Sequence, residues 1–316
     1  MRRHRILAVG LAALLLGALS GAGQAGAAPA APRATVPHGA LAAPSGGAPY
    51  IYPVLGGKDP VTVMHQTGVK AFTLAFILAG NGCNPVWDGA GALSNPAVKS
   101  RINAIRGAGG DVVISFGGYS GNKLGNACSS ASALAGAYQK VIDAYQLRTI
   151  DIDLEAGEVS QAAKVLGALK ITKQKNPNIQ IVMTLGTGIN GLEGAEARIP
   201  GQAVSLGATV HVWTIMPFDF GGQSGSDMGK LSLQASEGLH RQLKAAYKTK
   251  SDAEIYAMQG ISSMNGKTDE GETVTVANFK TMLGYANSHH LARYTFWELN
   301  RDGKLDYTKV IAQFTG

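Results

Sequence analysis

Three acidic residues alternate with apolar residues in one short stretch of the chain. Residues 148–155 read Arg-Thr-Ile-Asp-Ile-Asp-Leu-Glu, so Asp151, Asp153 and Glu155 stand two positions apart. This period predicts a β-strand on which the carboxyl groups share one face, with neighbours about 6.5–7 Å apart. Mutual repulsion and burial both disfavour ionisation, so we expect at least one carboxyl group to hold a proton near neutral pH. A protonated carboxyl group beside an ionised one can cleave a glycosidic bond.

The competing interpretation is an edge strand whose acidic face is solvated. Acidic residues are depleted in strands, and three of them on one face cost stability unless a function requires them. We therefore favour a site of acid–base chemistry, which the surrounding elements must position.

Eight strand-like stretches alternate with helical ones after residue 48. Most are nearly continuous apolar runs, typical of parallel strands covered on both faces. The expected strands are 49–55, 71–79, 111–116, 149–155, 179–185, 210–216, 254–258 and 293–299. Helical spacing is clear at 96–107, 130–146, 159–175, 231–248 and 276–288, and weaker near 200–206. We predict an α/β fold, a single-domain (β/α)8 TIM barrel over 48–316. An open doubly wound sheet ranks second, because no Gly-rich nucleotide-binding turn follows the first strand.

Such a barrel carries its active site at the C-terminal ends of the strands, and Glu155 ends the fourth expected strand. Other candidate site residues also stand near strand ends: Phe76, Gly117, Gly118, Met216, Phe218, Asp219 and Trp297. The glycines would let a ligand approach the backbone, Asp219 would hold a polar group, and Trp297 would form a flat floor for a sugar ring. The competing interpretations are ordinary glycine turns, a surface aspartate and core aromatic residues.

The N-terminal part of the chain has the composition of a targeting segment. Residues 1–27 combine a basic start, an apolar stretch at 6–19 and an Ala-Gly-Ala cleavage site, as in a secretory signal peptide. The apolar stretch is short for a membrane span, and an uncleaved anchor is the alternative. Residues 28–47, rich in Ala, Pro and Gly, are expected to form a linker. We therefore expect a secreted, extracellular protein.

Charge and cysteine count narrow the function classes. The formal net charge is +7, and no run of basic and aromatic residues suggests a nucleic-acid surface. Cys83 and Cys128 are the two cysteines; in a secreted chain they suggest one disulfide, and two unpaired thiols are the alternative. Neither has the partners of a zinc site, and His289 and His290 resemble the exposed end of a helix. We expect no cofactor, no metal, no nucleic-acid or membrane partner, and a monomer.

Taken in order, these motifs resemble glycoside hydrolase family 18, the chitinase family. Its fourth strand carries Asp-x-x-Asp-x-Asp-x-Glu, and the last three acids correspond to Asp151, Asp153 and Glu155. The other matches are Ser115, Gly117 and Gly118 in a Ser-x-Gly-Gly motif, Met216 and Asp219 in a Met-x-Tyr-Asp motif, and Trp297 in the eighth strand. The fourth-strand motif is fairly specific, and the others add weight by their order along 50–302.

Two positions depart from the family pattern. Arg148 replaces the first acid of the fourth-strand motif, and one hypothesis is that it forms a charge pair near Asp151. Phe218 replaces the tyrosine whose hydroxyl group contacts the substrate acetamido group in the family. Loss of one such donor would lower the rate by on the order of 10²–10³. Tyr119 and Tyr256 are candidate substitutes.

The resemblance implies hydrolysis of β-1,4-linked N-acetylglucosamine polymers, chitin or chito-oligosaccharides, with retention of anomeric configuration. Glu155 would be the general acid and base, and the acetamido oxygen of the substrate would be the nucleophile. Asp153 would orient the acetamido group, and Asp151 would share a proton with Asp153. Asp219 would help to hold the reacting sugar, and Trp297 would lie beneath it.

Two other functions are alternatives: an endo-β-N-acetylglucosaminidase acting on N-glycans, and a non-catalytic glycan-binding barrel. Glu155 favours an enzyme, whereas Phe218 favours the binding protein. The loops are short and no domain is inserted after the seventh strand, which favours an open groove and internal cleavage. No separate carbohydrate-binding module is visible, so we expect a preference for soluble or amorphous substrate.

Overall fold

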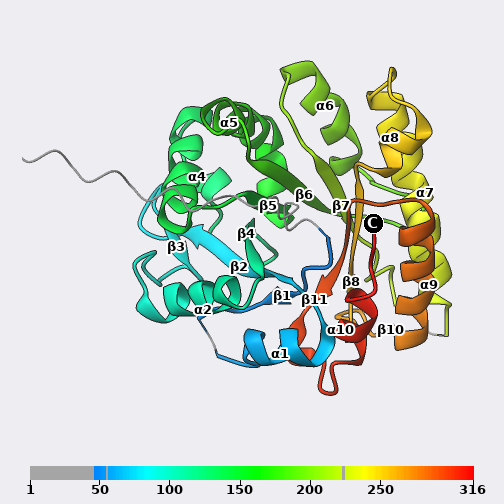
Figure 1. The fold of residues 1–316 in the computed structure, drawn as a ribbon. Coiled ribbons are helices and arrows are strands. Elements are labelled where there is room, and N and C mark those ends of the chain that lie inside the picture. Colours follow the sequence, from blue (N-terminus) through cyan, green and yellow to red (C-terminus); the bar gives the residue numbers. More distant parts are fainter. Residues whose placement is uncertain (1–45, 55, 223–224) are drawn as a thin grey trace, which may run out of the picture. The chain divides into compact units, whose positions relative to one another are not determined.

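Eight parallel strands form the central sheet, in the order β1-β2-β4-β5-β6-β7-β8-β11 (Figure 1). They are β1 (Tyr50–Ile51), β2 (Ala71–Ala79), β4 (Asp111–Gly117), β5 (Thr149–Leu154), β6 (Gln180–Gly186), β7 (Val212–Met216), β8 (Gln259–Met264) and β11 (Arg293–Trp297). The short β3 (Pro85–Trp87) pairs antiparallel with β2, and β9 (Gly266–Lys267) and β10 (Thr273–Val274) form a separate hairpin. The structure, a computed structural model, describes residues 46–54, 56–222 and 225–316. The expected signal peptide and nearly all of the expected linker lie outside these residues.

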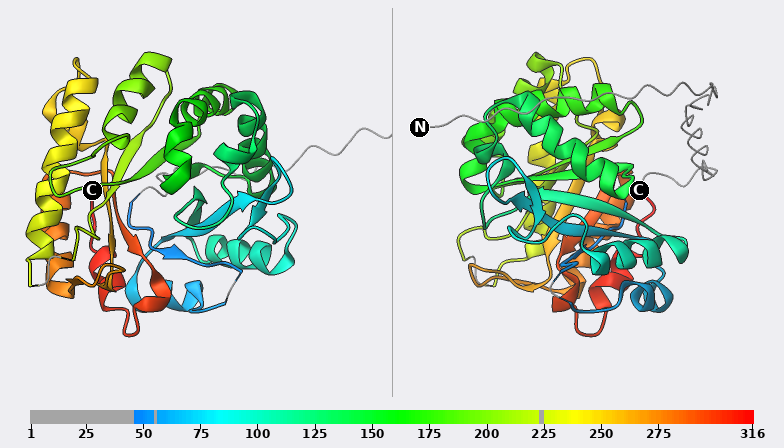
Figure 2. Two further views of the ribbon diagram at one scale, coloured as in Figure 1. Left: turned by 180° about the vertical axis from the view of Figure 1, so that it is seen from behind. Right: turned by 90° about the vertical axis from the view of Figure 1, so that its left-hand side faces the viewer.

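Helices connect the strands and cover the outside of the sheet, which confirms the (β/α)8 barrel (Figures 1 and 2). They are α1 (Pro60–Thr67), α2 (Pro96–Gly107), α3 (Leu124–Ala127), α4 (Ala131–Tyr145), α5 (Ala162–Lys175), α6 (Ile199–Leu206), α7 (Met228–Ala246), α8 (Asp252–Tyr256), α9 (Val276–Ser288) and α10 (Asp306–Ile311). Helices α7 and α9 pack side by side on the outside (Figure 2). Helix α2 shows why the local sequence folds this way. The Asn95 side chain accepts a hydrogen bond from the Ala97 amide, and Pro96 occupies the first turn.

The two ends of the sheet meet at β1 and β11. Within the described residues, no ladder of backbone hydrogen bonds joins these two strands. Side chains bridge the seam instead. The hydroxyl groups of Thr73 and Thr295 both donate to the Ala48 carbonyl oxygen, at 2.8 and 2.6 Å, and Arg293 Nη2 donates to Thr73 Oγ1 at 2.6 Å. The barrel is therefore closed at this seam mainly by buried polar side chains.

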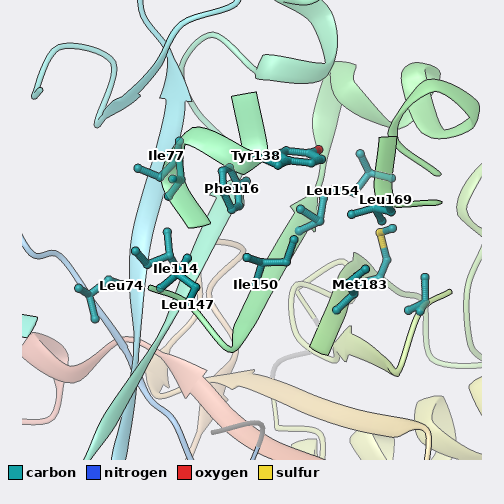
Figure 3. Packing of buried hydrophobic residues seen from close by; sticks show 14 of the residues in the cluster. Leu74, Ile77, Ile114, Phe116, Tyr138, Leu147, Ile150, Leu154, Leu169 and Met183 are labelled. Atoms are coloured by element: carbon teal, nitrogen blue, oxygen red, sulfur yellow. The ribbon is translucent and has the colours of Figure 1, made fainter. Parts of the chain in front are cut away.

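Buried apolar side chains fill the layer between the strands and the helices (Figure 3). Ile150 and Leu154 of β5 lie in this layer together with Tyr138 of α4 (Figure 3). Because side chains alternate along a strand, the same packing turns Asp151 and Asp153 toward the barrel interior. The apolar face of β5 is thus packed against the helices, and this packing fixes the direction of its acidic face.

The seventh expected strand was wrong. Residues 254–258 belong to helix α8 and the turn after it, and the strand at this position is β8. The helix begins at Ser251, whose hydroxyl accepts from the Glu254 amide while the Glu254 carboxylate accepts from the Ser251 amide. Strand β8 contains Gly260, where a Cβ atom would lie 2.7 Å from Thr214 Oγ1 and 2.9 Å from Arg293 Cβ. The crowded barrel interior thus requires a residue of low strand propensity.

Among the residues that the structure describes, no helix is both long enough and apolar enough to cross a membrane.

Candidate active site

Asp151 lies at the bottom of the acidic face, fully buried inside the barrel. Three hydroxyl groups donate to its carboxylate at 2.7 Å each: Tyr50 and Ser115 to Oδ2, and Thr184 to Oδ1. These donors come from β1, β4 and β6, so the barrel itself assembles the arrangement. Both oxygens of the Asp151 carboxylate therefore have hydrogen-bond donors.

Asp153 is the next acid toward the C-terminal end of β5, and it is also buried. Burial, and then the nearby charges of Glu155 and Asp151, raise the pKa of Asp153 well above its ordinary value. Its Oδ1 atom is buried without a hydrogen-bond partner in the described part of the chain. No hydrogen bond joins Asp153 to Asp151 among these residues. Burial therefore favours the protonated form of Asp153, and its Oδ1 atom is available to a ligand.

Glu155 follows β5 and is partly exposed. Burial is the main cause that raises its pKa to about 7; Lys123 opposes this effect, and Asp151 and Asp219 add to it. A carboxyl group with a pKa near 7 can donate a proton and take one back in the same reaction cycle.

These acids open into a cavity of ≈ 900 Å³ at the C-terminal ends of the strands. Most of the predicted site residues line it: Phe76, Asp153, Glu155, Met216, Phe218, Asp219 and Trp297. The rings of Phe76 and Trp297 are stacked, with centroids 5.3 Å apart and planes 17° apart, and Tyr52 meets Trp297 edge-on at 5.1 Å. This aromatic floor is suited to the flat apolar face of a sugar ring.

Gly117 and Gly118 lie behind the cavity wall. A Cβ atom on Gly117 (φ +99°) would meet the Asp153 carbonyl oxygen at 2.2 Å, and one on Gly118 (φ +83°) would meet the Phe76 ring at 2.8 Å. The Gly118 amide also donates to the Asp153 carbonyl oxygen at 2.8 Å. These glycines therefore permit close packing of β4 on β5 and of the loop on the aromatic floor.

Asp219 and Phe218 lie in the loop after β7, which the β9–β10 hairpin holds. Asp219 Oδ1 accepts from the Glu270 amide at 2.9 Å, and the Phe220 amide donates to Glu272 Oε1 at 2.7 Å. Of the two candidate tyrosines, Tyr119 lines the cavity and is 77% exposed.

Tyr256 is not a substitute for the missing tyrosine. It stacks on His240, with centroids 3.9 Å apart, and its hydroxyl group donates to Glu237 of α7. Its aromatic and hydrogen-bond partners thus belong to the outer helical layer.

Arg148 holds a charge pair, as hypothesised, and a partner in it is Asp111, at 2.6 Å. Asp111 begins β4 and also accepts from Arg106 at 2.8 Å. Burial alone would raise the pKa of Asp111, but hydrogen bonds from the two arginines outweigh it and lower the pKa. The cluster lies at the N-terminal end of the strands, because Asp111 and Arg148 stand at or before the first residues of β4 and β5.

The expected disulfide between Cys83 and Cys128 is confirmed. It joins the turn between β2 and β3 to the end of α3, across 45 positions of the chain. Residues 119–121, which precede α3, line the cavity. The bond therefore ties together two loops on the side of the cavity formed by β2 and β4.

Several lining residues were not identified from the sequence: Tyr50, Tyr52, Asp88, Ser262, Asp269 and Glu270. Two tyrosines alternating on the first expected strand were an available signal for Tyr50 and Tyr52. The other residues lie in turns or in the misassigned seventh strand. Among the described residues, no group of three or more His, Cys, Asp or Glu side chains is placed to hold a metal ion.

Known structures resemble this barrel over nearly its full extent. The catalytic domain of a hyperthermophilic chitinase from Pyrococcus furiosus matches with a TM-score of 0.80 and 30% sequence identity, over 86% of this chain and 96% of that one. The chain belongs to glycoside hydrolase family 18. No profile of a protein family matches the chain. A family 18 chitinase from Pseudoalteromonas aurantia, 17% identical with a TM-score of 0.61, shares the fold.

Two curated relatives extend the comparison of this family 18 member. The chain is 31% identical over 274 residues to a probable bifunctional chitinase/lysozyme of Escherichia coli, covering 81% of this chain and 30% of that protein. It is 30% identical over 250 residues to endochitinase 11 of Metarhizium anisopliae, covering 74% and 48%. The chain thus spans less than half the length of either relative.

Proposed function

We propose that the chain is a chitinase that hydrolyses β-1,4 linkages of N-acetylglucosamine polymers by a retaining, substrate-assisted mechanism. The observation that carries the proposal is the position of Glu155. It lines the cavity floored by Phe76 and Trp297, next to Asp153, with a pKa of about 7. The names of the relatives, chitinase/lysozyme, endochitinase and chitinase, support the same substrate class.

The proposed reaction has two steps. In the first, Glu155 gives its proton to the glycosidic oxygen while the acetamido oxygen of the substrate attacks the anomeric carbon, forming an oxazolinium intermediate. The unpartnered Oδ1 of Asp153 accepts a hydrogen bond from the acetamido N–H group and so orients the nucleophile. In the second step, the Glu155 carboxylate takes a proton from a water molecule. The oxygen of this water attacks the anomeric carbon and opens the oxazolinium ring. Asp151, held by three hydroxyl donors, adds to the effects that raise the pKa of Asp153.

The test is hydrolysis of a soluble chromogenic chitobiose or chitotriose glycoside by the wild type and by Glu155→Gln. We expect the variant to lose at least about 10²-fold in kcat, because it cannot donate a proton. Its affinity for chito-oligosaccharides should remain close to that of the wild type, which controls for folding. A loss smaller than about tenfold would contradict this role for Glu155.

The absence of a hydroxyl group at Phe218 supports a second candidate, a non-catalytic glycan-binding barrel. If wild type and Glu155→Gln both bind chito-oligosaccharides but neither releases the chromophore, this candidate replaces the first. If neither activity nor binding is found, N-glycans cleaved at their chitobiose core become the substrate to test.

We also propose internal cleavage of chains. A second hollow of ≈ 650 Å³ adjoins the cavity, and Gly186, Thr187 and Asp219 line both. The connection between β8 and α9 contains the small β9–β10 hairpin. A cleft of this extent beside a short loop favours endo action, in keeping with the relative named endochitinase.

The proposed enzyme is a secreted monomer that needs no cofactor and binds neither nucleic acid nor membrane. Residues 1–27 would be the signal peptide and 28–47 the linker. The disulfide supports secretion, because such bonds persist in oxidising compartments.

A further inference from the structure

A buried lysine stands beside the catalytic acids, and the proposed reaction does not use it. Lys123 immediately precedes α3 and is 3% exposed, although residues 119–122 before it are exposed. Its ammonium group donates to the carbonyl oxygens of Ser120 and Gly121, the latter at 3.2 Å. Ser120 and Gly121 line the cavity with Asp153 and Glu155. The charge of Lys123 is therefore fixed directly behind the cavity wall.

No ion pair neutralises this lysine at close range. No carboxylate oxygen of the described residues lies within 4.0 Å of its ammonium nitrogen. Burial lowers the pKa of Lys123, and the charges of Glu158, Glu155 and Asp153, in that order, oppose the effect. Because the hydrogen-bond partners of Lys123 are neutral carbonyl groups, its positive charge is not cancelled locally and acts on the acids around it.

Glu158 is the acid with the largest electrostatic effect on Lys123. It is 2% exposed, and its Oε1 accepts from the Gly125 amide at 2.6 Å. Burial raises the pKa of Glu158, while the Gly125 amide, Lys123 and Lys164 lower it. Lys164 of α5 donates to the Gly125 and Cys128 carbonyl oxygens, so it lies behind Glu158. Lys123 thus interacts electrostatically both with a buried structural acid and with the catalytic acids.

Charged groups of several described elements lie around Glu155: Asp88, Asp269 and Glu270 line the same cavity, and four further groups interact with Glu155 electrostatically. Asp151 and Asp153 come from its own strand, Asp219 from the loop after β7, and Lys123 from the loop after β4. The three acids favour the protonated form of Glu155. Lys123 is the one cation among these groups and favours the ionised form.

We propose that Lys123 is a positioning residue whose fixed positive charge sets the pH range over which Glu155 passes from proton donor to proton acceptor. The inference rests on the proposed role of Glu155. Without the lysine, Glu155 would hold its proton more tightly. The first step would then remain possible at higher pH, but the carboxylate needed in the second step would form less readily.

The test compares the wild type with Lys123→Met, which removes the charge, and with Lys123→Arg, which keeps it. The alkaline limb of kcat/KM against pH is measured with the chromogenic chitotriose glycoside. The Glu155 titration is followed independently by NMR of ¹³C-labelled glutamate carboxyl groups, assigned with Glu155→Gln. We expect Lys123→Met to raise both midpoints by about 0.5–1 pH unit and Lys123→Arg to leave them within about 0.2 unit.

Each outcome decides the inference. Unmoved midpoints in Lys123→Met overturn it even if kcat or the melting temperature falls, because a purely structural role predicts that pattern. An equal shift in Lys123→Arg also overturns it, since the charge is retained. If Lys123→Met does not fold, Lys123→Gln removes the charge with a polar side chain. If the wild type hydrolyses no substrate, the proposed function fails, and the NMR titration still tests the influence of Lys123 on Glu155.

Discussion

Asp151 and Asp153 stand two residues apart on β5, yet their carboxyl groups have different partners. Asp151 accepts three hydroxyl hydrogen bonds, whereas Asp153 Oδ1 accepts none within the described residues. Donors favour the ionised form, and burial without donors favours the protonated form. The environment therefore distinguishes two chemically identical groups: Asp151 is held by donors, whereas Asp153 lines the cavity with Glu155.

Tyr50→Phe tests the hydrogen bonding of Asp151. The variant removes one donor but keeps the ring that packs against Phe76 and Trp297. A hydrogen bond to a charged group contributes about 1.5–3 kcal/mol, so we expect kcat to fall about tenfold or more while KM changes little. The measurement is steady-state hydrolysis of the chitotriose glycoside.

Tyr294→Phe is the matched control for this variant. It also loses a buried hydroxyl hydrogen bond, to the Phe279 carbonyl oxygen, on the outer side of the barrel. It should lower the melting temperature without lowering kcat. Full activity in Tyr50→Phe would show that the hydrogen bond from Tyr50 to Asp151 is not needed for catalysis.

The sequence was enough to find the acids but not their partners. The acids of β5 follow a local two-residue period. Tyr50 and Lys123 reach the site through contacts that no local pattern encodes: Tyr50 is 101 positions from Asp151, and Lys123 is buried only because its loop folds back over it.

At the scale of elements, strands with apolar runs were predictable and β8 was not. Its sequence, Gln-Gly-Ile-Ser-Ser-Met, is rich in small residues. These residues fit the crowded barrel interior but give the segment low strand propensity. The preceding segment at 255–258 has high strand propensity and was therefore predicted as the seventh strand. Ser251 and Glu254, however, form a capping box that starts a helix. Recognising that box would have moved the strand to its observed position.

Two glycine substitutions test how the elements pack. Gly118 has φ +83°, and a Cβ atom would lie 2.8 Å from the Phe76 ring, so Gly118→Ala should destabilise the fold by about 1–3 kcal/mol and displace the aromatic floor. Gly136 lies inside α4 with open space around it, so Gly136→Ala should stabilise the fold by up to ~1 kcal/mol. Denaturant unfolding and kcat measure both effects.

The contrast between the two glycine variants is the informative result. Gly118→Ala should lose stability and activity together, whereas Gly136→Ala should keep full activity. If Gly118→Ala is as stable and as active as the wild type, the close approach of the β4 loop to Phe76 does not limit the site.

At the scale of the whole molecule, titrating groups change stability in opposite directions over the same pH range. His211 is half-buried, with its Nδ1 accepting from the Ile181 amide; burial first, and then Lys173, lower its pKa to about 4. Its contribution to stability is therefore lost as the pH falls from about 6.5 toward 4. Asp153 and Glu155 have raised pKa values, so the stability they contribute is lost as the pH rises. The acidic site thus opposes the histidine in the overall pH profile.

Glu155→Gln isolates one of these opposing contributions. Between pH 4.5 and about 7 the folded wild type retains a proton on Glu155 that the unfolded chain has released, so the wild type loses stability as the pH rises through this range. Glutamine does not titrate, and His211 is common to both proteins. The variant should match the wild type near pH 4 and exceed it above pH 7 by on the order of 2 kcal/mol, allowing for partial solvation of the group. Melting temperatures of both proteins from pH 4 to 8 measure the difference.

A constant difference at every pH would contradict the raised pKa of Glu155. The expected pattern, with lost activity, would mean that this position is maintained for its chemistry at a cost to the stability of the barrel.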